Sequence, residues 1–212
     1  MGILKHGPFG MATGKIQNMV SYDLNGKNVI RRIGRTRKKP TVRQLAVRQK
    51  MAVVIRFLKH LGPLIEFGFK AQAVAARKSA HNMATSYNTK NATVGEYPEI
   101  VMDYSKAMIS QGDLMQPIDP QVELLQGKLR FSWQNHPDLN YTNKKDQVMM
   151  LAYFPESHDI SADVYGALRT AGEDFLPIDN KLQQARMEVY MAFVSSDRET
   201  ASDTIYLGTI NG

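Results

Sequence analysis

The chain has 212 residues, of which 43% are hydrophobic and 22% are charged, and it contains no cysteine. This composition is typical of a globular protein with one large or two small domains. The lack of cysteine excludes a disulfide framework, a thiol nucleophile and any Cys-ligated zinc or iron–sulfur site. The net charge of +7 is unevenly spread, because residues 1–60 carry 14 basic side chains and one acidic one, whereas residues 111–212 carry 8 basic and 15 acidic ones. This split favours a polyanionic partner or head-to-tail self-association over catalysis.

The sequence contains no apolar run close to the roughly 20 residues that a membrane helix needs. Its start, MGILKHGPFG, has no apolar stretch long enough for a signal peptide. We therefore expect synthesis in the cytoplasm without a signal peptide and no membrane partner. Incorporation into a particle or assembly is left open.

Residues 16–33 predict a β-hairpin. Asn25 and Gly26 supply the two positive-φ positions of a type I′ turn between strands at 16–24 and 27–33. This turn pairs Tyr22 with Val29, and it pairs Val20 with Arg31. One face would then carry these apolar residues: Ile16, Val20, Tyr22, Leu24, Val29 and Ile33. A two-stranded hairpin is marginal alone, so this one is expected to pack on another part of the protein or on another subunit.

The run RRIGRTRKKP, residues 31–40, is predicted to be an extended basic arm that ends at Pro40. A helix is expected to follow, because Thr41 and Gln44 have the spacing of a capping box. Its apolar stripe would consist of Val47, Met51, Val54, Leu58 and Leu61. Gly62-Pro63 would end or kink this helix.

A second helix is predicted from Phe69 to about Tyr87, forming a helical hairpin with the first. Two short strands, 100–104 and 107–110, would follow. From residue 119 onward, short apolar segments alternate with turn residues, as in an antiparallel β-sandwich. The expected strands are 122–125, 128–133, 147–154, 164–170, 186–195 and 203–210.

The predicted fold class is therefore α+β: an N-terminal β-hairpin and basic arm, a helical hairpin, and a C-terminal antiparallel β-sandwich. The sequence MQPIDP, residues 115–120, contains two prolines and is the expected linker. The predicted domains are residues 1–115 and residues 119–212.

Two resemblances support this organisation. The segments LRFSW (129–133), VMMLAYF (148–154) and EVYMAFVSSD (188–197) make residues 119–212 resemble a fibronectin type III or immunoglobulin-like module. The N-terminal G-x-x-x-G-K start, Asn-Gly-Lys hairpin, P-T-x-x-Q-L helix start and Asp-Tyr-Ser-Lys segment resemble a Bacteroidota family of unknown function. The second resemblance implies an architecture and a lineage, and it carries no activity and no site residues.

Motifs of common enzyme sites are missing from the sequence. It has neither a G-x-x-x-x-G-K-[ST] nor a G-x-G-x-x-G loop, its five histidines have no zinc-ligand spacing, and it has no G-x-S-x-G motif. We therefore predict a protein that is not an enzyme, with no catalytic residue, cofactor, metal or small-molecule substrate.

The basic residues are the one candidate site, for nucleic acid or for a protein partner. These residues are Arg31, Arg32, Arg35, Arg37, Lys38, Lys39, Arg43, Arg48, Arg56 and Lys59. Guanidinium groups suit phosphate, but the segment offers no aromatic stacking platform, so nucleic-acid binding would be independent of sequence. The other hypothesis, favoured slightly because the chain encodes its own acidic surface, is a structural protein that forms homo-oligomers. A phage-like or surface-assembly component would fit this reading by analogy.

Overall fold

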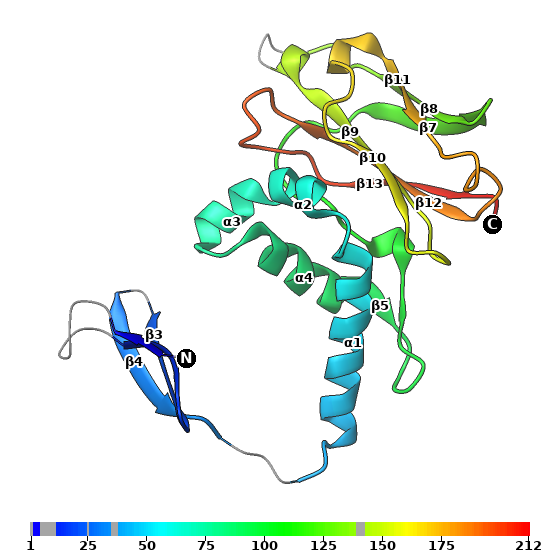
Figure 1. Ribbon diagram of the computed structural model, residues 1–212. Coiled ribbons are helices and arrows are strands. Elements are labelled where there is room, and N and C mark those ends of the chain that lie inside the picture. The colour runs from blue at the N-terminus through cyan, green and yellow to red at the C-terminus, as the bar shows by residue number, and fades with distance from the viewer. Residues whose placement is uncertain (1, 5–11, 25, 35–37, 139–142) are drawn as a thin grey trace. The chain divides into compact units, whose positions relative to one another are not determined.

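The computed structural model divides into two compact units, Met1–Thr41 and Val42–Gly212 (Figure 1). It describes residues 2–4, 12–24, 26–34, 38–138 and 143–212. The predicted α+β class, with N-terminal strands, then helices, then C-terminal sheets, is confirmed. The two units are treated separately below.

The first unit is a four-stranded antiparallel sheet in the order β1-β2-β3-β4. Its strands are β1 (Gly2–Leu4), β2 (Ala12–Ile16), β3 (Met19–Leu24) and β4 (Lys27–Arg32). The predicted pairing of β3 with β4 is confirmed, because Tyr22 lies opposite Val29 and Val20 opposite Arg31. Gly26 has the expected positive φ of 79°, while Asn25 lies outside the described residues.

The predicted strand at 16–24 is broken by a second turn. Gln17 takes a positive φ of 51° and begins a two-residue turn, so that Ile16 pairs with Met19. Lys15 therefore lies opposite Val20, and Ile16 is on the other face of the sheet. Opposed residues of antiparallel strands share a face, so the predicted common face of Ile16 and Val20 is wrong.

The second unit begins with helix α1 (Val42–Leu58), which starts directly after Thr41 as predicted. The predicted apolar stripe is buried only in its second half, at Val54, Leu58 and Leu61. Val47 is 61% exposed and Met51 is 40% exposed. A helix buries its apolar stripe only where another element packs against it. The apolar side chains in the first turns of α1 are therefore exposed to solvent.

The single helix predicted at 69–87 is wrong. Between residues 62 and 91 the structure has three helices: α2 (Gly62–Gly68), α3 (Lys70–Ala76) and α4 (Ala80–Asn91). Arg77 ends α3 in the left-handed conformation, with φ of 52°. The hydroxyl of Ser79 then accepts a hydrogen bond from the Asn82 amide at 3.2 Å and caps α4. This N-cap explains why the apolar spacing does not run through as one helix.

Strands β5 (Thr93–Val94) and β6 (Val101–Met102) pair after α4, but the strand predicted at 107–110 is absent from this described segment. Side chains form hydrogen bonds with the backbone of residues 108–110 instead. The side chain of Asn88 bonds both the amide and the carbonyl of Met108, at 2.9 and 2.8 Å. Thr204 Oγ1 accepts from the amides of Ile109 and Ser110 at 3.0 and 2.8 Å. Pairing by side chains leaves no need for a partner strand here.

The C-terminal strands form two antiparallel sheets, in the orders β10-β9-β12-β13 and β11-β8-β7. The strands are β7 (Ile118–Leu125), β8 (Lys128–Gln134), β9 (Gln147–Tyr153), β10 (Ile160–Asp163), β11 (Glu173–Pro177), β12 (Met187–Val194) and β13 (Ile205–Ile210). Five of the six predicted strands are confirmed within a few residues. The strand predicted at 164–170 is wrong, because that segment turns between β10 and β11 and enters a 3₁₀ helix at Arg169–Ala171.

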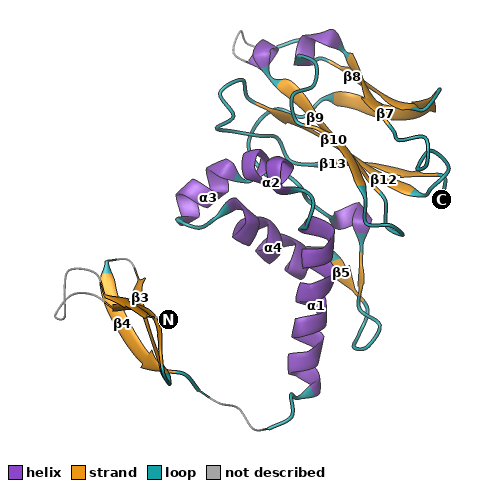
Figure 2. Cartoon of the chain, viewed as in Figure 1, coloured by secondary structure: helices purple, strands orange, loops and turns teal. Residues whose placement is uncertain are grey.

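Strands β9 and β12 are buried on both faces (Figures 1 and 2). One face packs on the sheet of β7, β8 and β11, in a cluster that includes Trp133 and Phe193. The other face packs on the helices, in a cluster that includes Phe57 and Tyr153. Helices and strands thus share a core, and the linker predicted at 115–120 lies inside the second compact unit rather than between two units.

We expect the substitution Phe57→Ala to destabilise residues 42–212 by about 3–5 kcal/mol, because it removes a buried ring from the shared core. Phe57 is 1% exposed and its ring lies 4.9 Å from that of Tyr153. The matched control is Ile55→Ala on the same helix, where the side chain is 45% exposed. Its effect should stay within about 0.5 kcal/mol. Urea unfolding of both variants measures the difference, and equal effects would contradict the packing described.

Candidate functional site

The predicted basic residues fall in both compact units. Arg31 and Arg32 end strand β4, so they belong to the sheet and do not begin an arm. Lys38 and Lys39 are exposed in the connection to α1, and residues 35 and 37 lie outside the described residues. The remaining four are all exposed: Arg43, Arg48 and Arg56 on α1, and Lys59 directly after its last residue.

These four basic residues do not share one face. At about 100° per residue, Arg48, Arg56 and Lys59 fall within roughly 80° of one another around the helix, and Arg43 lies well outside that sector. Within the described part of the chain, none of the four forms a hydrogen bond or an ion pair. Three of them therefore form a free cationic face on α1.

Strands β2, β3 and β4 of the N-terminal sheet bury few side chains. Within residues 12–24 and 26–34 only Ala12 and Ser21 are buried. Its large apolar side chains are instead exposed at Ile16, Met19, Leu24 and Ile30. Strand β4 ends the sheet, so the backbone groups along its outer side have no partner strand in the described unit.

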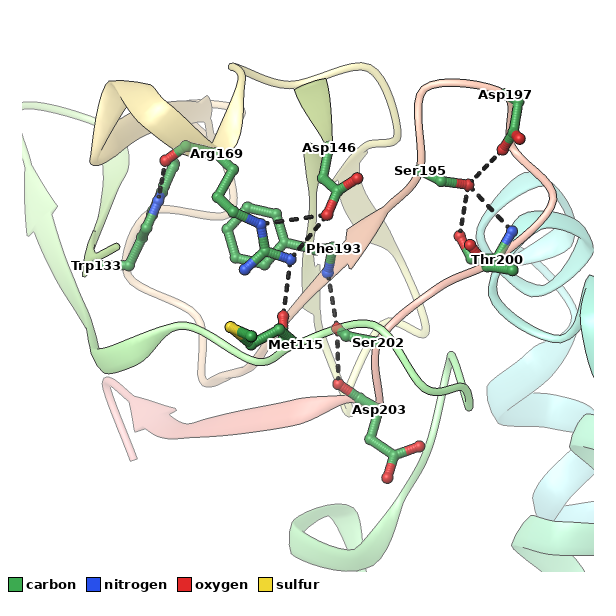
Figure 3. A network of polar contacts seen from close by, with 10 residues as sticks. All are labelled: Met115, Trp133, Asp146, Arg169, Phe193, Ser195, Asp197, Thr200, Ser202 and Asp203. Atoms are coloured by element: carbon green, nitrogen blue, oxygen red, sulfur yellow. Dashed lines mark hydrogen bonds and ion pairs between the residues drawn. The ribbon is translucent and has the colours of Figure 1, made fainter. Parts of the chain in front are cut away.

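A buried ion pair fixes one end of the sandwich (Figure 3). Arg169 and Asp146 are both 1% exposed, and the Arg169 Nη2 lies 3.1 Å from the Asp146 carboxylate. The same guanidinium donates to the Met115 carbonyl at 2.7 Å and lies 3.8 Å over the Phe193 ring. The indole of Trp133 donates to the Arg169 carbonyl at 2.7 Å. Arg169 thus links the 115–120 segment, both sheets and the β10–β11 connection, through its guanidinium and its backbone carbonyl.

Desolvation sets the electrostatics of this pair. Burial raises the pKa of the Asp146 carboxyl and lowers the pKa of the Arg169 guanidinium, although each is opposed by the attraction of the other charge. Both shifts mean that burial disfavours the charged forms more than the pairing favours them. The pair therefore fixes geometry rather than providing large net stability.

A second buried carboxylate, Glu188, lies within β12. Arg186 donates to its Oε1 through Nε and Nη2 at 3.0 and 2.7 Å. The hydroxyls of Tyr206 and Thr209 donate to its Oε2 at 2.5 and 2.8 Å. Both carboxylate oxygens are thus satisfied by the neighbouring strand and by the residue two positions before. Sequence reasoning missed this group, although a single acid inside the apolar run MEVYMAFV was the available signal.

Ser195 and Asp197 lie in the turn after β12. Ser195 Oγ donates to Asp197 Oδ1 at 2.6 Å and accepts from the Thr200 amide at 3.1 Å (Figure 3). Ser202 Oγ accepts from the Phe193 amide at 2.9 Å. These hydroxyls are engaged in closing the turn against β12.

Aromatic hydroxyls gather between the helices and the sandwich. The ring of Tyr153 lies 5.6 Å from that of Tyr104, and the Tyr190 hydroxyl donates to the Tyr104 carbonyl at 2.9 Å. Phenols keep their protons at neutral pH, and burial raises the pKa of all three further, so each can donate a hydrogen bond. The sequence offered no sign of this cluster, because its members come from separate elements.

Among the described residues, no group of three or more His, Cys, Asp or Glu side chains could hold a metal ion. In the same part, no helix has the length and apolar character needed to cross a membrane.

We expect Asp146→Asn to cost about 3–5 kcal/mol of unfolding free energy, because it leaves the Arg169 charge buried without its partner. The control is Glu173→Gln, which breaks the exposed Arg130–Glu173 pair, 2.8 Å in length. An exposed pair contributes about 1 kcal/mol or less. Thermal and urea unfolding report both values, and a small loss for Asp146→Asn would contradict the anchoring role.

Comparison with known proteins shows the family of the chain. Neither the curated proteins nor the solved structures contain a significant match to it. A family model, described as a family of unknown function (DUF6266), matches residues 11–208. The match covers residues 11–41 of the first unit and nearly all of the second, and the chain therefore belongs to the DUF6266 family.

Proposed function

We propose that the protein is a non-enzymatic structural component that self-assembles through its N-terminal sheet and the basic residues that follow it. In this proposal β4 and the basic arm of one copy dock on an acidic surface of another copy. A phage-like or surface assembly is the setting that such a component would suit.

The observation that carries the proposal is the exposure of apolar side chains on strands β3 and β4. A small sheet needs a hydrophobic face packed on something in order to be stable. Within residues 12–24 and 26–34 only Ala12 and Ser21 are buried, and Met19 and Ile30 are exposed. An unprotected edge such as β4 is a template for pairing with another chain. The sheet therefore has both an apolar face to cover and an edge to extend.

Charge favours an acidic acceptor over a symmetric β4–β4 pair. Antiparallel pairing of two β4 strands about their centre would set Lys27 opposite Arg32, and like charges directly opposed are unfavourable. Residues 1–41 carry nine basic side chains and one acidic one, whereas residues 111–212 have a net charge of −7. A head-to-tail contact would bring these opposite charges together.

We propose further that the sandwich is a fibronectin type III-like module acting as the partner-binding surface. Its support is the division into sheets of three and four strands, with the first, second and fifth strands in one sheet. The Bacteroidota lineage suggested by the sequence resemblance stays a prediction.

We expect the full chain to elute as an oligomer at low salt, and Arg31→Glu with Arg32→Glu to shift it toward the monomer. The matched control is Arg48→Glu with Lys59→Glu, which reverses the same number of charges on α1 and should leave the oligomer intact. Size-exclusion chromatography with light scattering measures both. A strict monomer at high concentration and low salt would overturn the proposal.

The cationic face of α1 supports a second candidate, binding of nucleic acid without sequence preference. Arg48, Arg56 and Lys59 are exposed and unpaired within the described residues. Such side chains are suited to phosphate, and counterion release would make the affinity depend strongly on salt. The exposed side chains of Lys38 and Lys39 are further candidates for phosphate contacts.

For this candidate we expect a mobility shift with duplex DNA at low salt. If six phosphate contacts form, log affinity should fall with log salt at a slope of roughly −5. Changing the six basic residues at the end of β4 and in the arm that follows it to Ala should abolish the shift: Arg31, Arg32, Arg35, Arg37, Lys38 and Lys39. No shift at low salt, or no loss in the six-residue variant, would rule out nucleic-acid binding through the arm.

A further inference from the structure

A pocket of about 190 Å³ lies between α1, the segment around β6 and the turn that follows β9. Its walls are mostly apolar side chains of α1 and of residues 100–102. Four polar side chains also line it: Arg56, Tyr104, Tyr153 and His158. All of these residues belong to the second compact unit, so the pocket does not depend on the N-terminal sheet.

The polar side of the pocket carries several hydrogen-bonding groups. The Tyr153 hydroxyl lies 2.9 Å from His158 Nδ1, and the Tyr153 ring lies 5.6 Å from that of Tyr104. Tyr153 is 1% exposed, so its position is fixed by packing. A phenol carries its proton at neutral pH, and burial raises the pKa of both tyrosines further, so both hydroxyls have a proton to donate.

Arg56 adds a positive charge that has no protein partner. It forms no hydrogen bond or ion pair in the described part of the chain, and the described residues that line the pocket include no carboxylate. Its charge is close enough to lower the pKa of Tyr104 and of Tyr153, although burial outweighs this effect. An unpaired guanidinium beside phenolic donors is a recognition site for a carboxylate or a similar anion.

The backbone at His158 supports a built site. His158 has a φ of 61°, a left-handed conformation that is uncommon for a residue other than glycine. Its amide donates to the Phe154 carbonyl at 2.8 Å, which closes the turn after β9 and holds the imidazole beside Tyr153. Conformations of this kind are concentrated at functional sites.

We propose that this pocket binds a small organic carboxylate with a short branched hydrocarbon group. The carboxylate would pair with Arg56 and accept from the Tyr104 hydroxyl, while the hydrocarbon would contact the apolar wall. The pocket volume equals roughly six shares of liquid water, which suits an acid of about six or seven non-hydrogen atoms, such as isobutyrate or isovalerate. This site is independent of the assembly proposed above.

The test uses the full-length protein and ligand-observed NMR titration with isovalerate. We expect a dissociation constant of about 1 mM or below. Isovaleramide, which has the same shape without the charge, should bind at least tenfold more weakly. Inorganic phosphate should also bind more weakly, because it lacks the hydrocarbon group. Equal binding of the amide, tighter binding of phosphate, or no binding of isovalerate would overturn the proposal.

Two variants locate the ligand. Arg56→Gln should weaken isovalerate binding at least tenfold, whereas Arg48→Gln, an exposed residue of the same helix outside the pocket lining, should leave it unchanged. Both residues are exposed and unpaired in the described structure, so unfolding curves should match those of the parent protein. Binding that survives Arg56→Gln, or that is lost equally in both variants, would place the ligand elsewhere and contradict the assignment.

Discussion

The burial of β9 and β12 on both faces is the constraint on which the rest of residues 42–212 depends. In a two-layer sandwich each sheet has one face in solvent, and its strands alternate apolar and polar residues. Here the helices cover the second face, so these two strands are apolar at nearly every position. Polar groups that lie inside this core must then be satisfied locally, as Glu188 is by Arg186, Tyr206 and Thr209.

The same constraint explains which parts of the fold could be predicted from the sequence. The runs VMMLAYF and EVYMAFV are long enough to be recognised as strands, and Asn-Gly set the β3–β4 register correctly. Periodicity within one strand does not say what covers its second face, so the shared core of helices and sandwich was not foreseen. The turn inside the predicted strand 16–24 and the break inside the predicted helix 69–87 were missed for a different reason. The turn at Gln17 and the helix end at Arg77 both use a left-handed residue other than glycine, which leaves a weak signal in the sequence.

The candidate sites also differ in how much of them could be predicted from the sequence. A run of basic residues is visible in the sequence, but its distribution over a strand, a connection and a helix is a property of the fold. The ion pair of Arg169 with Asp146 and the pocket beside Tyr153 combine residues from distant segments, so no local motif announces them. The protein thus combines a three-layer unit of helices and two sheets with a separate four-stranded sheet.

The most direct test of this account is whether the helices and the sandwich unfold as one unit. Trp133, the single tryptophan, lies in the core between the two sheets, and helix ellipticity reports α1 to α4 on the opposite side of β9 and β12. Urea unfolding of the full chain should give coincident transitions by Trp133 fluorescence and by helix ellipticity. Helix loss at a clearly lower urea concentration than the fluorescence change would contradict the shared core.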